Sequence, residues 1–281
     1  MNPVLLAEIV KTALIEDVQS GDITSEAIFQ TNSIISGAFI SKEAGVIAGL
    51  PVAAEVFRQL DPHISFTTIR PDGTEVSPGD QLASVTGPVR TILTGERTAL
   101  NFLRRLSGIA SQTARMVKLV QGLPVKIADT RKTTPGLRLL EKYAVRQGGG
   151  FNHRFGLADA VLIKDNHIAA CGSIQEAVRR ARQYIPHTMT IEVEVENEAQ
   201  LREALTAGAD IVLLDNMPPA EMARLVQLIK TLTPPGQRIL VEASGNIDES
   251  NVQAVAQSGV DIISSGALTH SADALDISLD I

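Results

Sequence analysis

Hydrophobic residues follow a regular pattern in the second half of the chain. Six short apolar runs rich in valine, leucine and isoleucine alternate with segments whose apolar residues recur at helical spacing. The apolar runs are VKIADT, DAVLIKD, TIEVEV, DIVLLDN, RILVEAS and DIISSGA, and the helical segments are SIQEAVRRARQYI, EAQLREALTAG, PPAEMARLVQLIK and SNVQAVAQSG. This alternation predicts repeated βα units with parallel strands. Because six strands are fewer than the eight of a complete barrel, we expect an open or incomplete parallel α/β barrel.

The first third of the chain is less regular. Apolar spacing predicts a helix from Pro3 to about Val18, which the segment GDITS ends. β-Branched and partly alternating residues predict strands within residues 33–49, 64–69 and 81–93. Residues 95–122 then predict one long helix, or two helices broken at Ser107–Gly108. This part therefore indicates a smaller α+β domain.

Polar side chains follow each apolar run of the second half. They are Asp129 to Lys132, Lys164 and Asp165, Glu192 and Glu194, Asp215, Glu242 and Ser244, and Ser264 to Gly266. In a parallel α/β barrel the carboxyl ends of the strands and the loops after them build the active site. We therefore expect these residues to meet at one mouth.

Charge is unevenly distributed along the chain. The formal net charge is -7, yet residues 129–154 carry six basic residues and only two acidic ones. A basic region in an acidic protein indicates a small anionic ligand. Nucleic acid is an unfavourable partner, because the overall charge repels polyanions and only 3% of residues are aromatic.

Two features bear on the compartment. Cys171 is the single cysteine, so no disulfide is expected and the reducing cytoplasm is the natural location. Charged residues interrupt the apolar residues at the N-terminus, which argues against a secretory signal and a membrane span there.

The segment DTRKTTPGLR, residues 129–138, places Arg131, Lys132 and Arg138 after a predicted buried strand. Guanidinium groups suit carboxylates and phosphates, so we favour a binding site over a solvated basic loop. The glycines 148–150 fit a helix end as well as a ligand contact. Neither a dinucleotide fingerprint nor a GxxxxGK[ST] phosphate loop occurs, which disfavours NAD and nucleoside triphosphates.

Several other side chains have two interpretations. His153 and His167 are candidate general acids or metal ligands, or structural residues, because neither belongs to an HExxH pattern. Glu194 and Asp215 could hold Mg²⁺ or face a developing positive charge, or could simply pair with basic residues. Lys164 suits either a Schiff base or an anion clamp, and the neighbouring arginines favour the clamp.

The chain resembles the quinolinate phosphoribosyltransferase family over essentially its whole length. The motifs that carry the resemblance are IEDVQSGDITS, ERTALNFLRRLSGIA, DTRKTTPGLR, LEKYAVRQGGGFNHRFGLADAVLIKDNH, EVEV, LLDN, EASGN and SSGALTHS. The resemblance implies an N-terminal α/β sandwich domain, residues 1–108 joined by 270–281, and a catalytic α/β barrel, residues 109–269. It also implies a Mg²⁺-dependent reaction of quinolinate with 5-phosphoribosyl 1-diphosphate that yields nicotinate mononucleotide, pyrophosphate and CO₂ for NAD biosynthesis.

The resemblance also implies roles for particular residues. Quinolinate would contact Arg131, His153, Arg154 and Lys164, with Lys132 and Arg138 lining the site. Glu194 and Asp215 would face the ribosyl diphosphate and its metal, with Lys132 and Lys164 among the catalytic groups. Four residues would surround the 5-phosphate: Ser244, Gly245, Gly266 and Ala267. Arg97 would reach the site of the neighbouring subunit. The smallest functional unit would then be a homodimer, which could be part of a higher homo-oligomer.

Two positions depart from the family pattern. Gln147 stands where many relatives have cysteine, and Asn246 stands where many have a second glycine. Three competing functions stay open from the residues. They are a related phosphoribosyltransferase with another acidic acceptor, a Schiff-base aldolase or lyase that uses Lys164, and a non-catalytic anion-binding protein.

Overall fold

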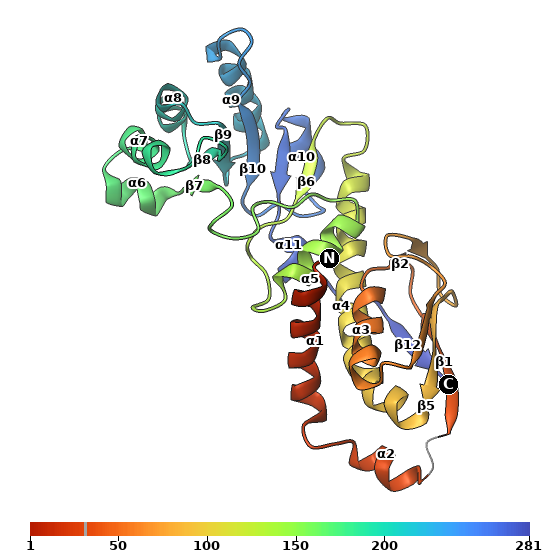
Figure 1. The fold of residues 1–281 in the computed structure, drawn as a ribbon. Coiled ribbons are helices and arrows are strands. Elements are labelled where there is room, and N and C mark those ends of the chain that lie inside the picture. Colours follow the sequence, from red (N-terminus) through yellow and green to blue (C-terminus); the bar gives the residue numbers. More distant parts are fainter. Residues whose placement is uncertain (31–32) are drawn as a thin grey trace. The chain divides into compact units, whose positions relative to one another are not determined.

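The structure, a computed structural model, describes residues 1–30 and 33–281 (Figure 1). The chain forms two compact units. The first contains Met1–Ala114, Thr133–Gly149 and Ser271–Ile281, and the second contains Arg115–Lys132 and Gly150–His270. Compared with the expected division after residue 108, the first unit also holds residues 109–114 and 133–149. The domain boundary itself stays a prediction.

The N-terminal unit contains a four-stranded antiparallel sheet. Its order is β12 (Ile277–Asp280), β1 (Ile34–Ser41), β5 (Gln81–Pro88) and β3 (Ser65–Thr68), with β12 supplied by the C-terminal end of the chain. A separate two-stranded ribbon pairs β2 (Gly45–Val46) with β4 (Glu75–Val76). The C-terminal segment thus completes the N-terminal sheet.

Helices α3 (Leu50–Leu60) and α4 (Val89–Leu119) lie beside this sheet in Figure 1. Phe39 of β1, Phe57 of α3 and Phe66 of β3 form an aromatic cluster with ring centroids 5.7–6.2 Å apart. Because large aromatic rings bury much apolar surface, this cluster fixes α3 on the sheet.

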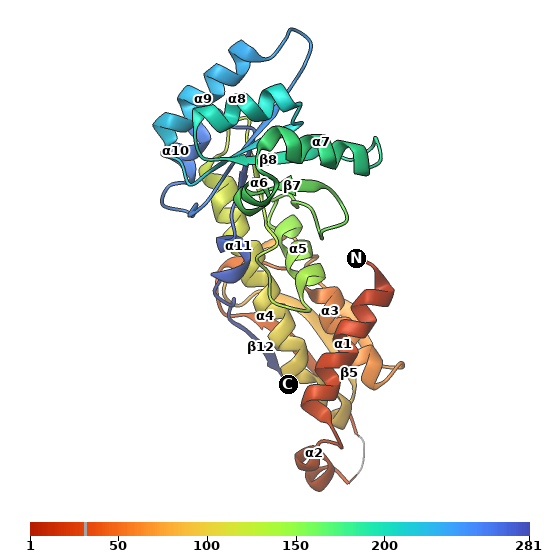
Figure 2. The same cartoon turned by 90° about the vertical axis from the view of Figure 1, so that its left-hand side faces the viewer.

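The first helices begin where side chains cap them. Helix α1 (Pro3–Val18) starts after Asn2, whose side chain accepts the Val4 N–H, and packs against α3 (Figure 2). The predicted stop at GDITS is confirmed, but a second short helix, α2 (Ile23–Ile28), follows at once. It begins because Asp22 accepts the Ser25 N–H as an N-cap.

Helix α4 is continuous, so the possible break at Ser107–Gly108 is absent. It also begins earlier than predicted, because Pro88 ends β5 and residues 89–93 are helical instead of extended. Gly108 allows a close approach: a Cβ there would lie 1.8 Å from the carbonyl oxygen of Asp273. Ser107 and Ser111 face the ribbon, where their hydroxyls accept the N–H groups of Ala48 and Val46.

Helix α5 (Arg138–Gln147) also belongs to the N-terminal unit. It ends at the predicted glycines, and Gly148 N–H bonds back to the Ala144 carbonyl. A Cβ at Gly148 would lie 2.3 Å from the Ala110 carbonyl oxygen, so this glycine permits α5 to meet α4. Its role in the structure is therefore helix packing.

The C-terminal unit contains a six-stranded sheet in which all strands are parallel. Its order is β6 (Lys126–Ala128), β11 (Ile262–Ser264), β10 (Leu240–Ser244), β9 (Ile211–Asp215), β8 (Ile191–Val195) and β7 (Val161–Ile163). All six predicted strands are confirmed. Since β6 and β7 are the two ends of this order and do not pair, the barrel is open.

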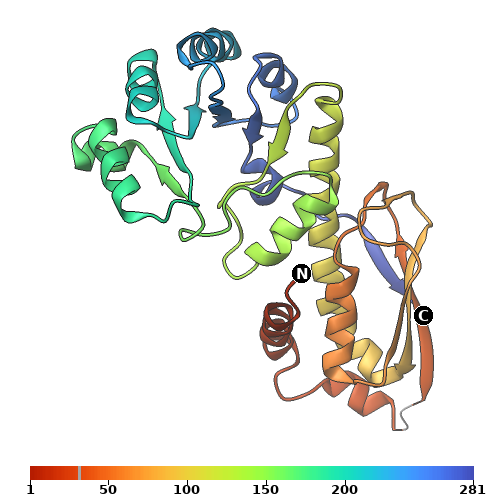
Figure 3. The same ribbon diagram turned by 45° about the horizontal axis from the view of Figure 1, so that its top comes forward.

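Helices lie outside the curved sheet of this unit (Figure 3). They are α6 (Asp165–Cys171), α7 (Ile174–Tyr184), α8 (Glu198–Ala207), α9 (Pro219–Leu232), α10 (Val252–Gln257) and α11 (Ala267–His270). Four of them match the predicted helical segments, whereas the short helices α6 and α11 were missed. None of the helices in residues 1–30 and 33–281 combines the length and apolar character that crossing a bilayer requires.

We predict that Gly108→Ala destabilises the N-terminal unit. In an open helix interior this change stabilises by about 0.5–1 kcal/mol, but here the added methyl meets backbone. Overpacking costs about 1–3 kcal/mol, so the melting temperature should fall by several degrees in a thermal scan. Gly156→Ala is the control, because its nearest neighbour would lie 4.0 Å away. Equal melting temperatures for the two variants would contradict the close approach.

Candidate active site

A cavity of about 510 Å³ lies within the C-terminal unit, at the carboxyl ends of its strands. Its wall is formed by residues from every strand of the sheet or the loops that follow. They are Thr130, Arg131, Lys132, His153, Arg154, Leu162, Lys164, Glu194, Leu213, Asp215, Asn216, Glu242, Ser244, Gly245, Asn246 and Ser264. The cavity thus brings together part of the predicted set of polar strand ends, whereas Asp129, Asp165, Glu192, Ser265 and Gly266 are not in its wall.

Nine of the residues predicted for the site line this cavity. They are Arg131, Lys132, His153, Arg154, Lys164, Glu194, Asp215, Ser244 and Gly245. Arg97 and Arg138 instead belong to the N-terminal unit, where Arg97 is exposed on α4 and Arg138 begins α5. The Arg138 Nε donates to Thr133 Oγ1 at 3.0 Å. Gly266 and Ala267 do not line the cavity wall itself.

The buried carboxylate of Asp129 organises the loop that carries two of these residues. It accepts the His153 N–H at 2.9 Å and the Asn152 Nδ2–H at 2.6 Å. Arg154, the residue after His153, lines the cavity. Its Nη1 donates to the Ala160 carbonyl at 2.9 Å. This supporting role of Asp129 was not predicted, because it depends on a contact between separate segments of the chain.

Arg154 is prepared to bind an anion. Its Nε is buried, and no described residue accepts a hydrogen bond from it. Burial lowers the pKa of Arg154, and the positive charge of nearby Arg131 lowers it further. Two neighbouring guanidinium groups with an open donor are electrostatically unfavourable until an anion arrives.

Two carboxylates lie beside these cations. The Nζ of Lys164, at the end of β7, is 3.3 Å from Oε2 of Glu194 in β8. The pKa of Glu194 is raised, mainly by burial. The positive charge of Lys164 opposes this shift, and the negative charge of Asp215 adds to it. An ammonium in an ion pair is an anion-binding group, whereas a Schiff base requires the neutral amine. The contact thus favours the clamp interpretation of Lys164.

The loops after β9 and β10 approach closely. Gly245 has φ +96°, and a Cβ there would lie 2.3 Å from Asn216 Oδ1, so a larger residue does not fit. Asn216 and Asn246 both adopt left-handed conformations, with φ of 51° and 50°. Asn246 Nδ2 donates to Asn216 Oδ1 at 3.0 Å, and Asn216 Nδ2 donates to Asp215 Oδ2 at 2.7 Å.

The loop after β11 supports Lys132. A Cβ at Gly266 would lie 2.8 Å from Lys132 Cδ, and Thr269 Oγ1 donates to the Lys132 carbonyl at 2.6 Å. Ala267 N–H donates to Ser265 Oγ at 3.2 Å. Gly266 therefore adjoins the cavity through Lys132, and Ala267 is the next residue of this loop.

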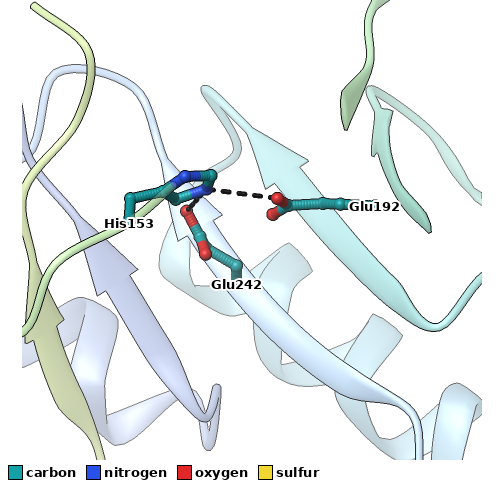
Figure 4. A group of neighbouring side chains, drawn as sticks. All are labelled: His153, Glu192 and Glu242. Carbon is teal, nitrogen blue, oxygen red and sulfur yellow. Dashed lines mark ion pairs between the residues drawn. The ribbon is translucent and has the colours of Figure 1, made fainter. Parts of the chain in front are cut away.

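His153 and Glu242 of the cavity wall form, with Glu192, a cluster that the sequence did not assign (Figure 4). His153 Nε2 lies 3.1 Å from Glu192 Oε2 and 3.4 Å from Glu242 Oε1, and both carboxylates are buried. Burial raises the pKa of Glu242 to about 7, and Glu192 raises it while His153 opposes the shift. His153, Glu192 and Glu242 are also close enough together to be a candidate metal site.

Sequence reasoning gave no site role to Glu192, which does not line the cavity, or to Glu242, which does. Glu192 and Glu242 had been noted only as polar strand ends, although their spacing from Glu194 and Ser244 carries a signal. Side chains two apart in a strand share one face, so Glu192 and Glu242 had to point inward with their neighbours. Thr130 and Ser264, also noted only as polar strand ends, and Asn216, the residue after β9, line the cavity as well.

Comparison with known families covers most of the chain. The family model of the quinolinate phosphoribosyl transferase C-terminal domain matches residues 109–280, and that of its N-terminal domain matches residues 22–107.

Individual relatives agree with the family models. A probable carboxylating nicotinate-nucleotide pyrophosphorylase of Bacillus subtilis is 46% identical, over 100% of this chain and 95% of the relative. The carboxylating nicotinate-nucleotide pyrophosphorylase of Homo sapiens is 40% identical, over 99% and 92%. The solved structure of NadC from Streptococcus pyogenes has a TM-score of 0.93 at 46% identity, over 100% of this chain and 97% of that one. Matches of this extent and identity establish that the chain belongs to the quinolinate phosphoribosyl transferase family.

Proposed function

We propose that the cavity of the C-terminal unit binds quinolinate next to 5-phosphoribosyl 1-diphosphate and joins them with loss of CO₂. This is carboxylating nicotinate-nucleotide pyrophosphorylase activity, a step of NAD biosynthesis, and it is the activity of the family to which the chain belongs. The observation that supports this location is the mixed cavity wall. Four cationic side chains and the three acidic residues Glu194, Asp215 and Glu242 line one space of about 510 Å³.

The cationic side of the cavity fits quinolinate. Two carboxylates on a planar ring need cations in fixed positions, and guanidinium groups provide paired donors. We assign this role to Arg131, Arg154 and Lys164, all of which line the cavity. The open Nε of Arg154 is the clearest single donor for a substrate carboxylate.

The acidic side fits the ribosyl diphosphate and Mg²⁺. Glu194 and Asp215 end adjacent strands and are close enough for each charge to affect the other, and oxygen ligands are those that Mg²⁺ prefers. When bound there, the ion would neutralise the negative charge of the pyrophosphate leaving group. Ser244, Gly245 and Gly266 are assigned to the 5-phosphate, with Ala267 beside them.

The chemistry needs no covalent enzyme intermediate. The ring nitrogen of quinolinate forms a bond to C1 of the ribose as the C1–O bond to pyrophosphate breaks. Positive charge grows on the ribose in this step, and the carboxylates of Glu194 and Asp215 stabilise it. The cationic ring then accepts the electron pair released with CO₂, and a proton replaces the carboxylate on that carbon. Lys132 and Lys164 lower the repulsion between the two anionic substrates.

A neighbouring subunit would complete the site. Arg97 is exposed on α4 of the N-terminal unit, and the family resemblance assigns it to the site of a second subunit. A homodimer with shared sites is accordingly part of the proposal, with Arg138 as a further lining residue.

One assay tests the function directly. The purified protein is incubated with Mg²⁺, 5-phosphoribosyl 1-diphosphate and quinolinate labelled in the carboxylate next to the ring nitrogen. We expect labelled CO₂ and nicotinate mononucleotide to appear in equal amounts. Turnover of nicotinate or another acid without turnover of quinolinate would instead identify a related phosphoribosyltransferase.

Arg154→Lys should lower kcat/KM for quinolinate by about 10- to 100-fold, since a hydrogen bond to a charged group contributes about 1.5–3 kcal/mol. The matched control is Arg238→Lys, because the Arg238 side chain is 76% exposed in a surface ion pair with Asp261. Steady-state kinetics with quinolinate as the varied substrate provide the measurement. Kinetics of Arg154→Lys equal to those of the control would remove Arg154 from the quinolinate site.

Mixing Arg97→Ala and Lys164→Ala subunits should restore activity. In a random mixture about a quarter of all sites combine an intact Lys164 with an intact Arg97 of the neighbour, if the dimer is symmetric. Activity after mixing and re-equilibration is compared with each variant alone. Absence of recovery in dimers that have exchanged subunits would mean that Arg97 acts within its own chain.

A further inference from the structure

The His153, Glu192 and Glu242 cluster admits two chemical interpretations. It is either a metal site or a hydrogen-bonded anchor for the imidazole (Figure 4). The two differ in which ring nitrogen of His153 carries the proton. A metal bound with the two carboxylates would need a lone pair on Nε2, whereas an anchor needs a proton there.

The backbone decides between them. The N–H of Arg154 donates to Nδ1 of His153 at 2.8 Å, so Nδ1 acts as an acceptor and carries no proton. A histidine ring keeps at least one proton, which must then be on Nε2. Nε2–H points toward Glu192 Oε2 at 3.1 Å and Glu242 Oε1 at 3.4 Å. The geometry therefore favours the anchor and leaves no lone pair on Nε2 for a metal.

We infer that Glu192 and Glu242 are positioning residues that hold His153 through Nε2–H, so that His153 fixes Arg154 in the cavity wall. This inference rests on the proposed function for its kinetic consequence, but not for its geometry. Three consecutive contacts form the link: glutamates to Nε2, Nδ1 to the Arg154 N–H, and Arg154 Nη1 to the Ala160 carbonyl. They leave the buried Arg154 Nε directed to an anion instead of to the protein.

The burial of the two glutamates supports a specific role. Their side chains are 6% and 3% exposed, and in each the Oε1 atom makes no hydrogen bond within the described residues. Burying such oxygens is unfavourable, so two carboxylates in this position require a compensating partner. His153 Nε2 is the group that both carboxylates face, 3.1 Å from Glu192 Oε2 and 3.4 Å from Glu242 Oε1, and the Ser264 side chain is a further hydrogen-bond partner of Glu242.

Nitrogen-15 NMR tests the geometry without any substrate. The chain has five histidines, so the His153 signals are identified by their loss in His153→Gln. We expect the Nε2 signal of a protonated nitrogen and the Nδ1 signal of an unprotonated one. A protonated Nδ1, or a metal ion bound in equal amount to the purified protein and lost in Glu242→Leu, would overturn the inference.

Kinetics test the positioning role. Glu192→Leu and Glu242→Leu should each raise KM for quinolinate about tenfold and change KM for 5-phosphoribosyl 1-diphosphate little, since the loss of one hydrogen bond to a charged group has this effect. Glu192→Gln and Glu242→Gln should restore near-normal values, because the amide oxygen still accepts from Nε2–H. Glu221→Leu, a change of an exposed glutamate on α9, is the control.

The outcomes separate this inference from the proposed function. If the wild-type protein does not turn over quinolinate, the proposed function is wrong. The NMR signal of the Arg154 Nε–H group in Glu192→Leu and Glu242→Leu still tests the positioning role. A shifted or broadened Arg154 signal in the leucine variants, restored in the glutamine variants, supports it. An unchanged Arg154 signal, or equal increases in both KM values, would count against it.

Discussion

All six strands of the C-terminal sheet run in the same direction, and the chemistry of the cavity depends on this constraint. Parallel strands bring their carboxyl ends to one edge, so residues far apart in the chain must meet there. Here that edge gathers Arg131, Arg154 and Lys164 together with Glu194 and Asp215. Opposite charges offset the free energy needed to remove each other from water. The Lys164 Nζ and Glu194 Oε2 atoms, 3.3 Å apart, are one such pair.

The same constraint explains why so much of the site could be predicted. A run of branched apolar residues that ends on a polar one fixes both the strand and the place where its side chains emerge. Lys164, Glu194 and Asp215 were recognisable in this way, and the cavity contains all three. The pattern of apolar and polar residues does not show which other side chain each of these residues contacts. Glu192 and Glu242 stayed without a role because His153, which they contact, lies on a loop of another βα unit.

The errors in the predicted elements have a similar cause. Glycine inside a helical pattern can mark a break, and Gly108 left both one long helix and a helix pair open. In the structure the helix continues, because the space of the missing side chain is filled by the backbone at Asp273 near the chain end. The role of Arg138 in the site stays a prediction, and the segment 129–138 that suggested it divides between the two units after Lys132. Contacts made by distant segments are not visible in local sequence.

Asn246 shows how a departure from a family pattern can preserve the geometry of a site. A glycine after Gly245 would adopt a left-handed conformation freely, and asparagine is among the few other residues that tolerate it. Asn246 has φ 50°, so the backbone conformation available to glycine is kept. Its side chain then adds a link that glycine lacks, from Asn246 through Asn216 to the carboxylate of Asp215. Because Asn216 holds one oxygen of that carboxylate, these hydrogen bonds restrict the orientation of the Asp215 side chain. Asn246 is thus less free in its backbone than glycine would be, but its side chain helps to hold Asp215 in place at the cavity.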